Sequence, residues 1–357
     1  MGEPAALLPR YAICRRCAMK YPKLLQKDDI IGICAPSSGA LGDVLSARLD
    51  NAVSNIKSLG YKVIETASVR NEIKCVSASS ITRVAEFMSL YENPKVSAII
   101  PPWGGEFLMD MLPFLDFAKL AALPAKWVCG YSDITTLTFA LTLVGDIATV
   151  HGSNSLNMGY ARIHETDLRA FESMSNQAIE QKSWETWGNF TSWNDFTQDI
   201  YKLENPSLWK SLQGEAKVSF GGMMIGGCMD TLCKLLGTRF APVENFLEKY
   251  KQHGFIWTLE SCEMTAPDIY RTLWQMRECG WFKYCNGIII GRPDGYREKR
   301  DFALTDALEQ GLGCLNVPVI YDADIGHIPP QMQIVNGAIG RLEYADGRAS
   351  LRQSFGD

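Results

Sequence analysis

The chain has 357 residues, 46% of them hydrophobic, and a formal net charge of −5. This acidic balance argues against nucleic acid as a main partner, because binding to phosphates requires a basic face. The length favours two domains over one. No apolar run approaches the ~20 residues that a membrane-spanning helix needs, so we expect no membrane association.

The first 20 residues form an extension that fits neither domain, and they lack the charge order of a signal peptide. Eleven cysteines without a regular framework indicate a reducing compartment. We therefore expect a cytoplasmic protein with free thiols. Cys14 and Cys17 form a lone C-x-x-C pair with no second pair at zinc spacing, so we expect no metal.

Residues 21–165 alternate apolar runs of strand length with segments of helical periodicity. This alternation predicts a parallel sheet covered by helices, in which ligands bind beyond the carboxyl ends of the strands. Three loops rich in Gly, Ser or Pro follow predicted strands there, and we expect them to converge on one crevice. They span Pro36–Gly39, Pro101–Gly105 and Gly130–Ser132.

Ser132 lies at a predicted bend between a short strand and a helix. Such a bend can present a hydroxyl beside a helix N-terminus, where backbone N–H groups favour a developing negative charge. The spacing is not G-x-S-x-G, because Ile134 holds the last position. Ser132 therefore has two interpretations at this stage, a nucleophile or an N-cap of the helix.

Residues 166–212 are polar and weakly periodic, and they contain Trp184, Trp187, Trp193 and Trp209. We predict a connector or lid. Its tryptophans either pin a long loop to the body of the protein or form an aromatic wall for a planar ligand.

Residues 213–357 contain further strands and helices, and two polar side chains stand out among them. Glu260 ends an apolar strand, where it can orient a histidine or pair with an arginine such as Arg271. His327 lies in a tight loop after a strand and is the best placed of four histidines to act as a base. His151, which follows a strand, is either a buried hydrogen-bonding residue or a pocket group.

Seven short motifs occur along the chain in an order that resembles the LD-carboxypeptidase family of serine peptidases. This family includes the microcin C self-immunity branch (MccF type). The resemblance runs from about residue 21 to the C-terminus. The motifs lie at residues 33–39, 103–105, 112–116, 130–135, 226–238, 259–260 and 326–331.

The resemblance implies an N-terminal parallel, flavodoxin-like α/β domain and a C-terminal α/β domain with a mixed, barrel-like sheet. It implies a catalytic triad of Ser132, Glu260 and His327, with the backbone of Gly105 and Asp133 as oxyanion donors. It also implies a homodimer that requires no cofactor. The alternative of another class is a non-catalytic protein that binds a peptide or nucleotide on the same fold.

The tryptophan-bearing stretch is similar to the longer loop of the microcin C immunity branch. We therefore predict cleavage of the amide bond of a peptidyl- or aminoacyl-adenylate, with trimming of a murein tetrapeptide as the alternative. Cys228 stands where the family often has Asn, so a substrate contact is altered there. The expected substrate contacts are Gly104, Trp184, Trp187, Trp193, Cys228 and Asp230.

Overall fold

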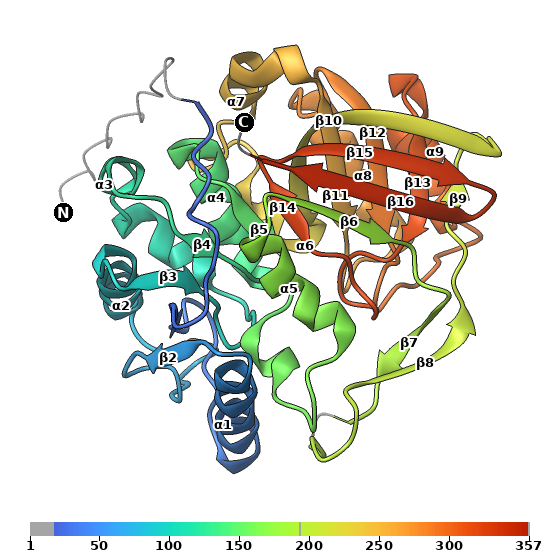
Figure 1. Cartoon of the computed structure of the whole chain (residues 1–357). Coiled ribbons are helices and arrows are strands. Elements are labelled where there is room, and N and C mark those ends of the chain that lie inside the picture. Colours follow the sequence, from blue (N-terminus) through green and yellow to red (C-terminus); the bar gives the residue numbers. More distant parts are fainter. Residues whose placement is uncertain (1–17, 193, 356–357) are drawn as a thin grey trace, which may run out of the picture.

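The computed structural model describes residues 18–192 and 194–355. Two sheets organise these residues, with the N-terminal half of the chain on one side of the molecule and the C-terminal half on the other (Figure 1). The predicted α/β class, with a parallel N-terminal sheet and a mixed C-terminal sheet, is confirmed. Cys14, Cys17 and Trp193 lie outside the described residues.

The N-terminal sheet is parallel, with strand order β2-β1-β3-β4. A parallel bridge from Cys129 to Val150 extends this order to β5 (Thr149–His151), which gives the flavodoxin-like order. Its other strands are β1 (Ile30–Ile33), β2 (Lys62–Glu65), β3 (Val96–Ile99) and β4 (Trp127–Val128), and its helices are α1 (Asp43–Ser58), α2 (Ser80–Glu92), η1 (Leu108–Phe114), α3 (Phe117–Ala122), η2 (Ser132–Ile134), α4 (Thr135–Gly145) and η3 (Ser155–Met158).

The segment predicted as a connector contains regular structure. The strands β6 and β9 pair with β16 and β13 and form the two edges of the C-terminal sheet, while β7 and β8 form an antiparallel hairpin. The partners of β6 and β9 lie far away in the sequence, so the local pattern of this polar stretch did not reveal these two strands. The elements are α5 (Glu165–Ser175), β6 (Ala178–Lys182), β7 (Thr186–Phe190), β8 (Tyr201–Pro206) and β9 (Lys210–Ser211).

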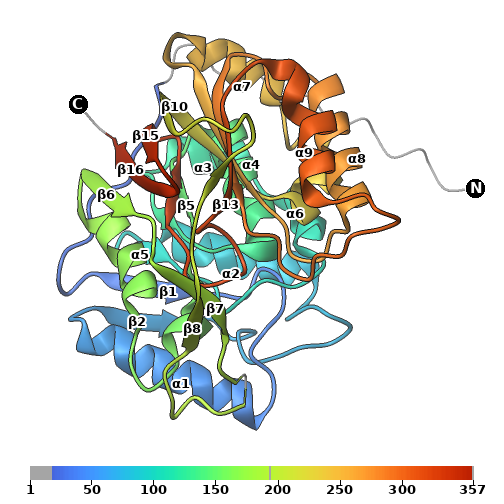
Figure 2. The same ribbon diagram turned by 90° about the vertical axis from the view of Figure 1, so that its right-hand side faces the viewer.

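The C-terminal sheet has eight strands in the order β6-β16-β15-β10-β11-β12-β13-β9, of which β10 to β13 are parallel. Figure 2 shows α8 and α9 side by side along one face of this sheet. The elements are β10 (Lys217–Cys228), α6 (Met229–Leu235), α7 (Val243–Tyr250), η4 (Lys251–His253), β11 (Phe255–Glu260), α8 (Ala266–Glu278), β12 (Cys285–Gly291), α9 (Leu304–Leu312), η5 (Gly313–Leu315), β13 (Val319–Ala323), β14 (Ile334–Asn336), β15 (Ile339–Ala345) and β16 (Arg348–Ser354).

A short antiparallel ladder between β5 and β14 joins the two halves of the chain. It pairs His151 with Ile334 and Thr149 with Asn336, and all of these side chains are buried. The ladder fixes the end of β5 against the C-terminal half, where β11 ends at the buried Glu260.

Within residues 18–192 and 194–355, no helix combines the length and the apolar character needed to cross a membrane.

Candidate active site

A cavity of about 490 Å³ lies where the two halves of the chain meet. The three loops predicted to converge all contribute to its lining, through Ser38, Gly105 and Ser132 among others. This part of the sequence-based prediction is confirmed. The lining residues are Ser38, Glu72, Cys75, Trp103, Gly104, Gly105, Glu106, Tyr131, Ser132, Asn154, Leu156, Asn157, Phe190, Cys262, Asp294 and His327.

Ser132 occupies a strained turn between β4 and α4. Its φ of 63° lies in the left-handed region, which a residue with a Cβ rarely adopts. The turn is tight, because a Cβ on Gly130 would lie 2.6 Å from Asn154 Oδ1 and 2.7 Å from a methyl carbon of Ile134. Surrounding packing thus holds Ser132 at a sharp strand-to-helix bend that exposes its side chain to the cavity.

The backbone of Gly104 lies against the hydroxyl of Ser132. A Cβ built on Gly104 would lie 2.9 Å from Ser132 Oγ and 3.0 Å from the backbone nitrogen of Asp133. The adjacent Gly105 has a φ of 147°, and a Cβ there would lie 2.4 Å from Ser37 Oγ. The structure therefore brings together the Ser132 hydroxyl, the Gly104 backbone and the backbone nitrogen of Asp133.

The side chain of Asp133 ties the cavity loops to one another. Its Oδ2 atom accepts hydrogen bonds from Ser37 Oγ at 2.6 Å and from the backbone N–H of Leu108 at 2.9 Å. Burial raises the pKa of Asp133, and these hydrogen bonds oppose that rise. The carboxylate of Asp133 thus holds the loops in place, while its backbone N–H lies beside Ser132.

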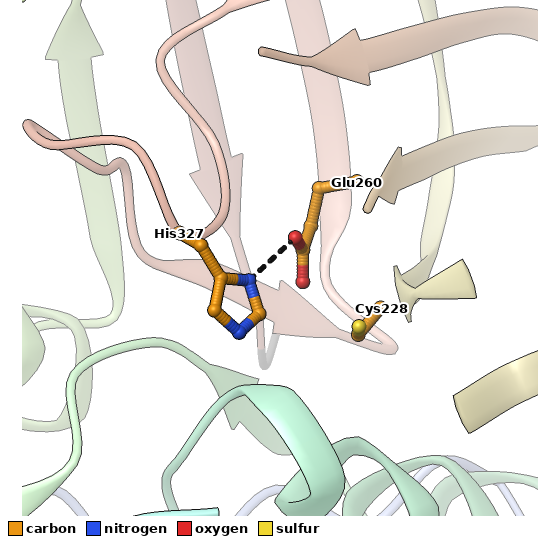
Figure 3. A group of neighbouring side chains, drawn as sticks. All are labelled: Cys228, Glu260 and His327. Carbon is orange, nitrogen blue, oxygen red and sulfur yellow. Dashed lines mark hydrogen bonds and ion pairs between the residues drawn. The ribbon is translucent and has the colours of Figure 1, made fainter. Parts of the chain in front are cut away.

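Glu260 and His327 form a buried pair on the C-terminal side of the cavity. His327 Nδ1 and Glu260 Oε2 are 2.8 Å apart, and the dashed line in Figure 3 marks this contact. The Glu260 side chain is fully buried, whereas that of His327 is 12% exposed and lines the cavity. The Nε2 atom of His327 has no hydrogen-bond partner among the described residues. This is the atom that would accept a proton from a nucleophile.

The charges of the pair stabilise each other. Burial alone would lower the pKa of His327, but the charge of Glu260, the neighbouring Cys262 side chain and the hydrogen bond to Glu260 raise it well above the usual value. Burial alone would raise the pKa of Glu260, but the charge and hydrogen bond of His327 lower it. The Tyr131 ring meets the His327 ring edge-on, with centroids 4.8 Å apart. The pair is therefore a strong base with a fixed orientation.

His151 lies on the other side of Glu260. Its Nε2 atom is 3.6 Å from Glu260 Oε1, and its side chain is 1% exposed. Its Nδ1 atom is 3.3 Å from the hydroxyl of Thr135. Burial is the largest influence on His151 and lowers its pKa to about 4, so the ring is neutral near pH 7. Of the two interpretations of His151, the buried hydrogen-bonding residue describes it better, since it does not line the cavity.

Cys228 is buried beside the Glu260–His327 pair (Figure 3). One ligand atom from each of the three residues lies within 4.8 Å of the others, and they are the candidate metal ligands among the described residues. A thiol, an imidazole and a carboxylate suit zinc, but in this structure Glu260 and His327 are hydrogen bonded to each other. The arrangement thus fits an acid–base pair without requiring a metal.

Of the expected substrate contacts, Gly104 lines the cavity, whereas Asp230, Trp184 and Trp187 do not. Asp230 accepts hydrogen bonds from the backbone N–H groups of Cys262 and Glu263, at 2.9 and 3.1 Å, and so holds the loop after Glu260. The guanidinium of Arg169 lies over the ring of Trp184, and that of Arg292 lies over the ring of Trp187. From the same hairpin, Phe190 contributes to the cavity lining instead.

Several neighbours of the candidate triad were not predicted from the sequence. Tyr131 directly precedes Ser132, and Cys262 follows Glu260 by two positions. This adjacency was the signal in the sequence that could have identified them. Phe190 and Asp294 come from segments whose approach to the cavity depends on the tertiary fold. The suggested partner of Glu260, Arg271, pairs with Asp268 instead.

Comparison with known proteins gives matches along both halves of the chain. The model of the LD-carboxypeptidase N-terminal domain matches residues 31–152, and that of the LD-carboxypeptidase C-terminal domain matches residues 221–342. A Vibrio cholerae protein named as a carboxypeptidase is 26% identical over 91% of this chain and 96% of its own length. The murein tetrapeptide carboxypeptidase of Pseudomonas aeruginosa is 22% identical over 84% of this chain and 88% of its own.

Solved structures show the same fold. The MccF-like protein from Bacillus anthracis superimposes with a TM-score of 0.81 at 24% identity, covering 94% of this chain and 99% of that one. The microcin C7 self-immunity protein MccF, solved in complex with aspartyl sulfamoyl adenosine, gives a TM-score of 0.75 at 21% identity, covering 94% and 98%.

Proposed function

Since the chain belongs to the LD-carboxypeptidase family and is a hydrolase of the carboxypeptidase type, we propose that it cleaves amide bonds through an acyl-enzyme on Ser132. One observation carries this proposal. The strained turn at Ser132 and the His327–Glu260 pair come from opposite halves of the chain. Ser132 and His327 line the same cavity, and Glu260 holds His327 from behind through a 2.8 Å contact.

The chemistry follows from the properties of these groups. His327 in its neutral form takes the proton of the Ser132 hydroxyl as the oxygen attacks the amide carbonyl. Glu260 holds the ring through its Nδ1 atom, which leaves Nε2 to act as the base, and it stabilises the imidazolium that forms. The N–H groups of Gly105 and Asp133 stabilise the oxyanion. His327 then gives the proton to the leaving amine, and a water molecule hydrolyses the ester.

We propose that the substrate carries an amino group close to the bond that is cleaved. Glu72, Glu106 and Asp294 line the cavity, and none of the described lining residues is a lysine or arginine. A cavity lined by carboxylates attracts cations and repels anions. An aminoacyl-adenylate with its α-amino group and a murein tetrapeptide with a diamino acid both satisfy this requirement.

Different features of the cavity favour each of these two substrates. The aromatic side chains of Trp103, Tyr131 and Phe190 offer surfaces on which a nucleobase can stack, which favours a peptidyl- or aminoacyl-adenylate. The tetrapeptide remains a candidate because the side-chain amino group of its diamino acid suits the three carboxylates. We propose the adenylate as substrate and keep the tetrapeptide as the second candidate.

Turnover of two compounds tests the proposal. The wild-type protein and Ser132→Ala are incubated with aspartyl sulfamoyl adenosine and with a murein tetrapeptide, and the products are read by mass spectrometry. Serine-dependent cleavage of either compound supports the proposed chemistry and identifies the branch of the family. Binding of a compound by both proteins with no cleavage by either would instead favour a non-catalytic binding protein.

A further inference from the structure

We propose that His151 is a positioning residue of the active site, which donates its Nε2–H to Glu260 Oε1 and so fixes the carboxylate that orients His327. This inference rests on the proposed function, because it gives His151 a task in the triad chemistry. It concerns a residue that does not line the cavity and that cannot reach the substrate from its buried position.

Two buried polar atoms face each other without other partners. His151 Nε2 and Glu260 Oε1 are 3.6 Å apart, and neither has a hydrogen-bond partner among the described residues. A buried polar atom that is left without a partner destabilises the folded state. A separation of 3.6 Å is longer than a hydrogen bond, but hydrogen bonds of catalytic groups often shorten only when substrate binds.

The surroundings of His151 decide which ring nitrogen carries the proton. The hydroxyl of Thr135 accepts a hydrogen bond from the backbone N–H of Cys228 at 3.3 Å and lies 3.3 Å from His151 Nδ1. These are the two hydrogen bonds found for this hydroxyl among the described residues, so we infer that its hydrogen is directed at Nδ1. Nδ1 is then the acceptor, and the proton of the neutral ring is on Nε2.

This tautomer places a donor opposite the carboxylate. With the proton on Nδ1 instead, the lone pair of Nε2 would face the lone pairs of Glu260 Oε1 inside a buried site, which is unfavourable. With the proton on Nε2, both carboxylate oxygens have a donor, Oε1 from His151 and Oε2 from His327. The neutral ring adds no second positive charge, so His327 remains the group that balances Glu260.

Loss of this donor has a predictable electrostatic effect. A carboxylate that loses a hydrogen bond becomes more basic and holds the proton on His327 more strongly. The pKa of His327 therefore rises further, and less neutral base is present at a given pH. The other titratable groups that face the pair are Cys228, Cys262 and Tyr131. All three residues are still present in a His151 variant.

Nuclear magnetic resonance tests the tautomer without any substitution. The chain has four histidines, so a long-range ¹H–¹⁵N spectrum of the ¹⁵N-histidine-labelled protein resolves each ring. We expect the His151 signals, identified by their loss in His151→Gln, to report a neutral ring with the proton on Nε2 from pH 8 down to pH 6. A proton on Nδ1, or a charged His151 ring at pH 7, would overturn the inference.

A matched pair of variants tests the role in catalysis. The amide nitrogen of His151→Gln can take the place of Nε2, whereas the shorter His151→Asn reaches only as far as Nδ1. With folding checked by thermal melting, we expect kcat/KM of His151→Asn to fall by about 100-fold and its acid limb to move to higher pH. His151→Gln should recover most of the rate and the wild-type limb. Equal losses in both variants with an unmoved limb would show a merely structural role.

Failure of this inference is distinguishable from failure of the proposed function. If Ser132→Ala retains full turnover, the acyl-enzyme chemistry is wrong whatever the state of His151. If Ser132→Ala is inactive while the two His151 variants behave alike, the chemistry stands and the positioning role of His151 is refuted.

Discussion

Replacement of Gly104 by alanine probes the space in front of the nucleophile. The new Cβ would lie 2.8 Å from Ser132 Cβ, 2.9 Å from Ser132 Oγ and 3.0 Å from the backbone nitrogen of Asp133. Ordinary contacts of a Cβ are 3.4–4 Å, so the nucleophile or the Gly104–Gly105 loop must shift by about half an ångström or more. Misplacement of this order costs about 100-fold in rate, equal to ~2.7 kcal/mol of transition-state stabilisation.

The assay is kcat/KM for the cleaved substrate, together with thermal melting of each protein. The control is Gly313→Ala, because a Cβ there meets nothing within 4 Å and the residue has right-handed helical dihedrals. We expect Gly313→Ala to match the wild type, and Gly104→Ala to lose about 100-fold in kcat/KM while remaining folded. A folded Gly104→Ala protein within threefold of the wild-type rate would refute the placement of Gly104 against the reacting atoms.

Four further predictions follow from the charges of the site and the core. Because the pKa of His327 lies well above its usual value and the neutral ring is the base, kcat/KM should rise with pH along a limb centred above ~6.5; a limb centred below pH 6 would contradict this. Glu260→Gln should lower kcat/KM by about 10³-fold or more. It should also move that limb to lower pH, because the charge that raises the pKa of His327 is lost. An unchanged limb in the pH–rate profile would argue against the Glu260–His327 pair. Dialysis against EDTA should leave turnover unchanged, since no proposed step uses the Cys228–Glu260–His327 set as metal ligands; loss of turnover that zinc restores would contradict the mechanism. Burial raises the pKa of Asp167 to about 7, so its contribution to stability is complete below its unfolded pKa of ~3.9 and declines until the pH has risen through 7. The melting temperature of Asp167→Asn, relative to that of the wild type, should therefore be higher at pH 8 than at pH 5. A relative melting temperature that falls between pH 5 and pH 8 would refute this.

The fold of the N-terminal half could be predicted because its signals are local. Buried strands such as β3 and helices such as α2 carry their own periodicity, and Ser79 caps the latter by accepting from the backbone N–H of Thr82. The edge strands β6 and β9 could not be predicted in the same way. Each is short and polar, and its hydrogen bonds go to strands more than a hundred residues further along the chain.

The site was predictable to the extent that each residue belongs to a local motif. Ser132 and His327 each follow a strand, Glu260 is the last residue of one, and the resemblance of the motifs placed them together. The role of the tryptophans depends on tertiary packing, which composition does not determine. The ring of Trp184 packs against Arg169, and Trp209 donates to Asp324 at 3.0 Å, so these side chains anchor the segment to the body of the protein.

The central claim is that Ser132 is the nucleophile of an acyl-enzyme mechanism. The most direct measurement is intact-mass analysis and peptide mapping after reaction with a fluorophosphonate, which labels a serine activated by a neighbouring base. We predict one adduct per chain, located on Ser132, absent from Ser132→Ala and slowed strongly in His327→Ala. Turnover of substrate by a protein that carries no adduct on Ser132, or an adduct on a different serine, would contradict the account.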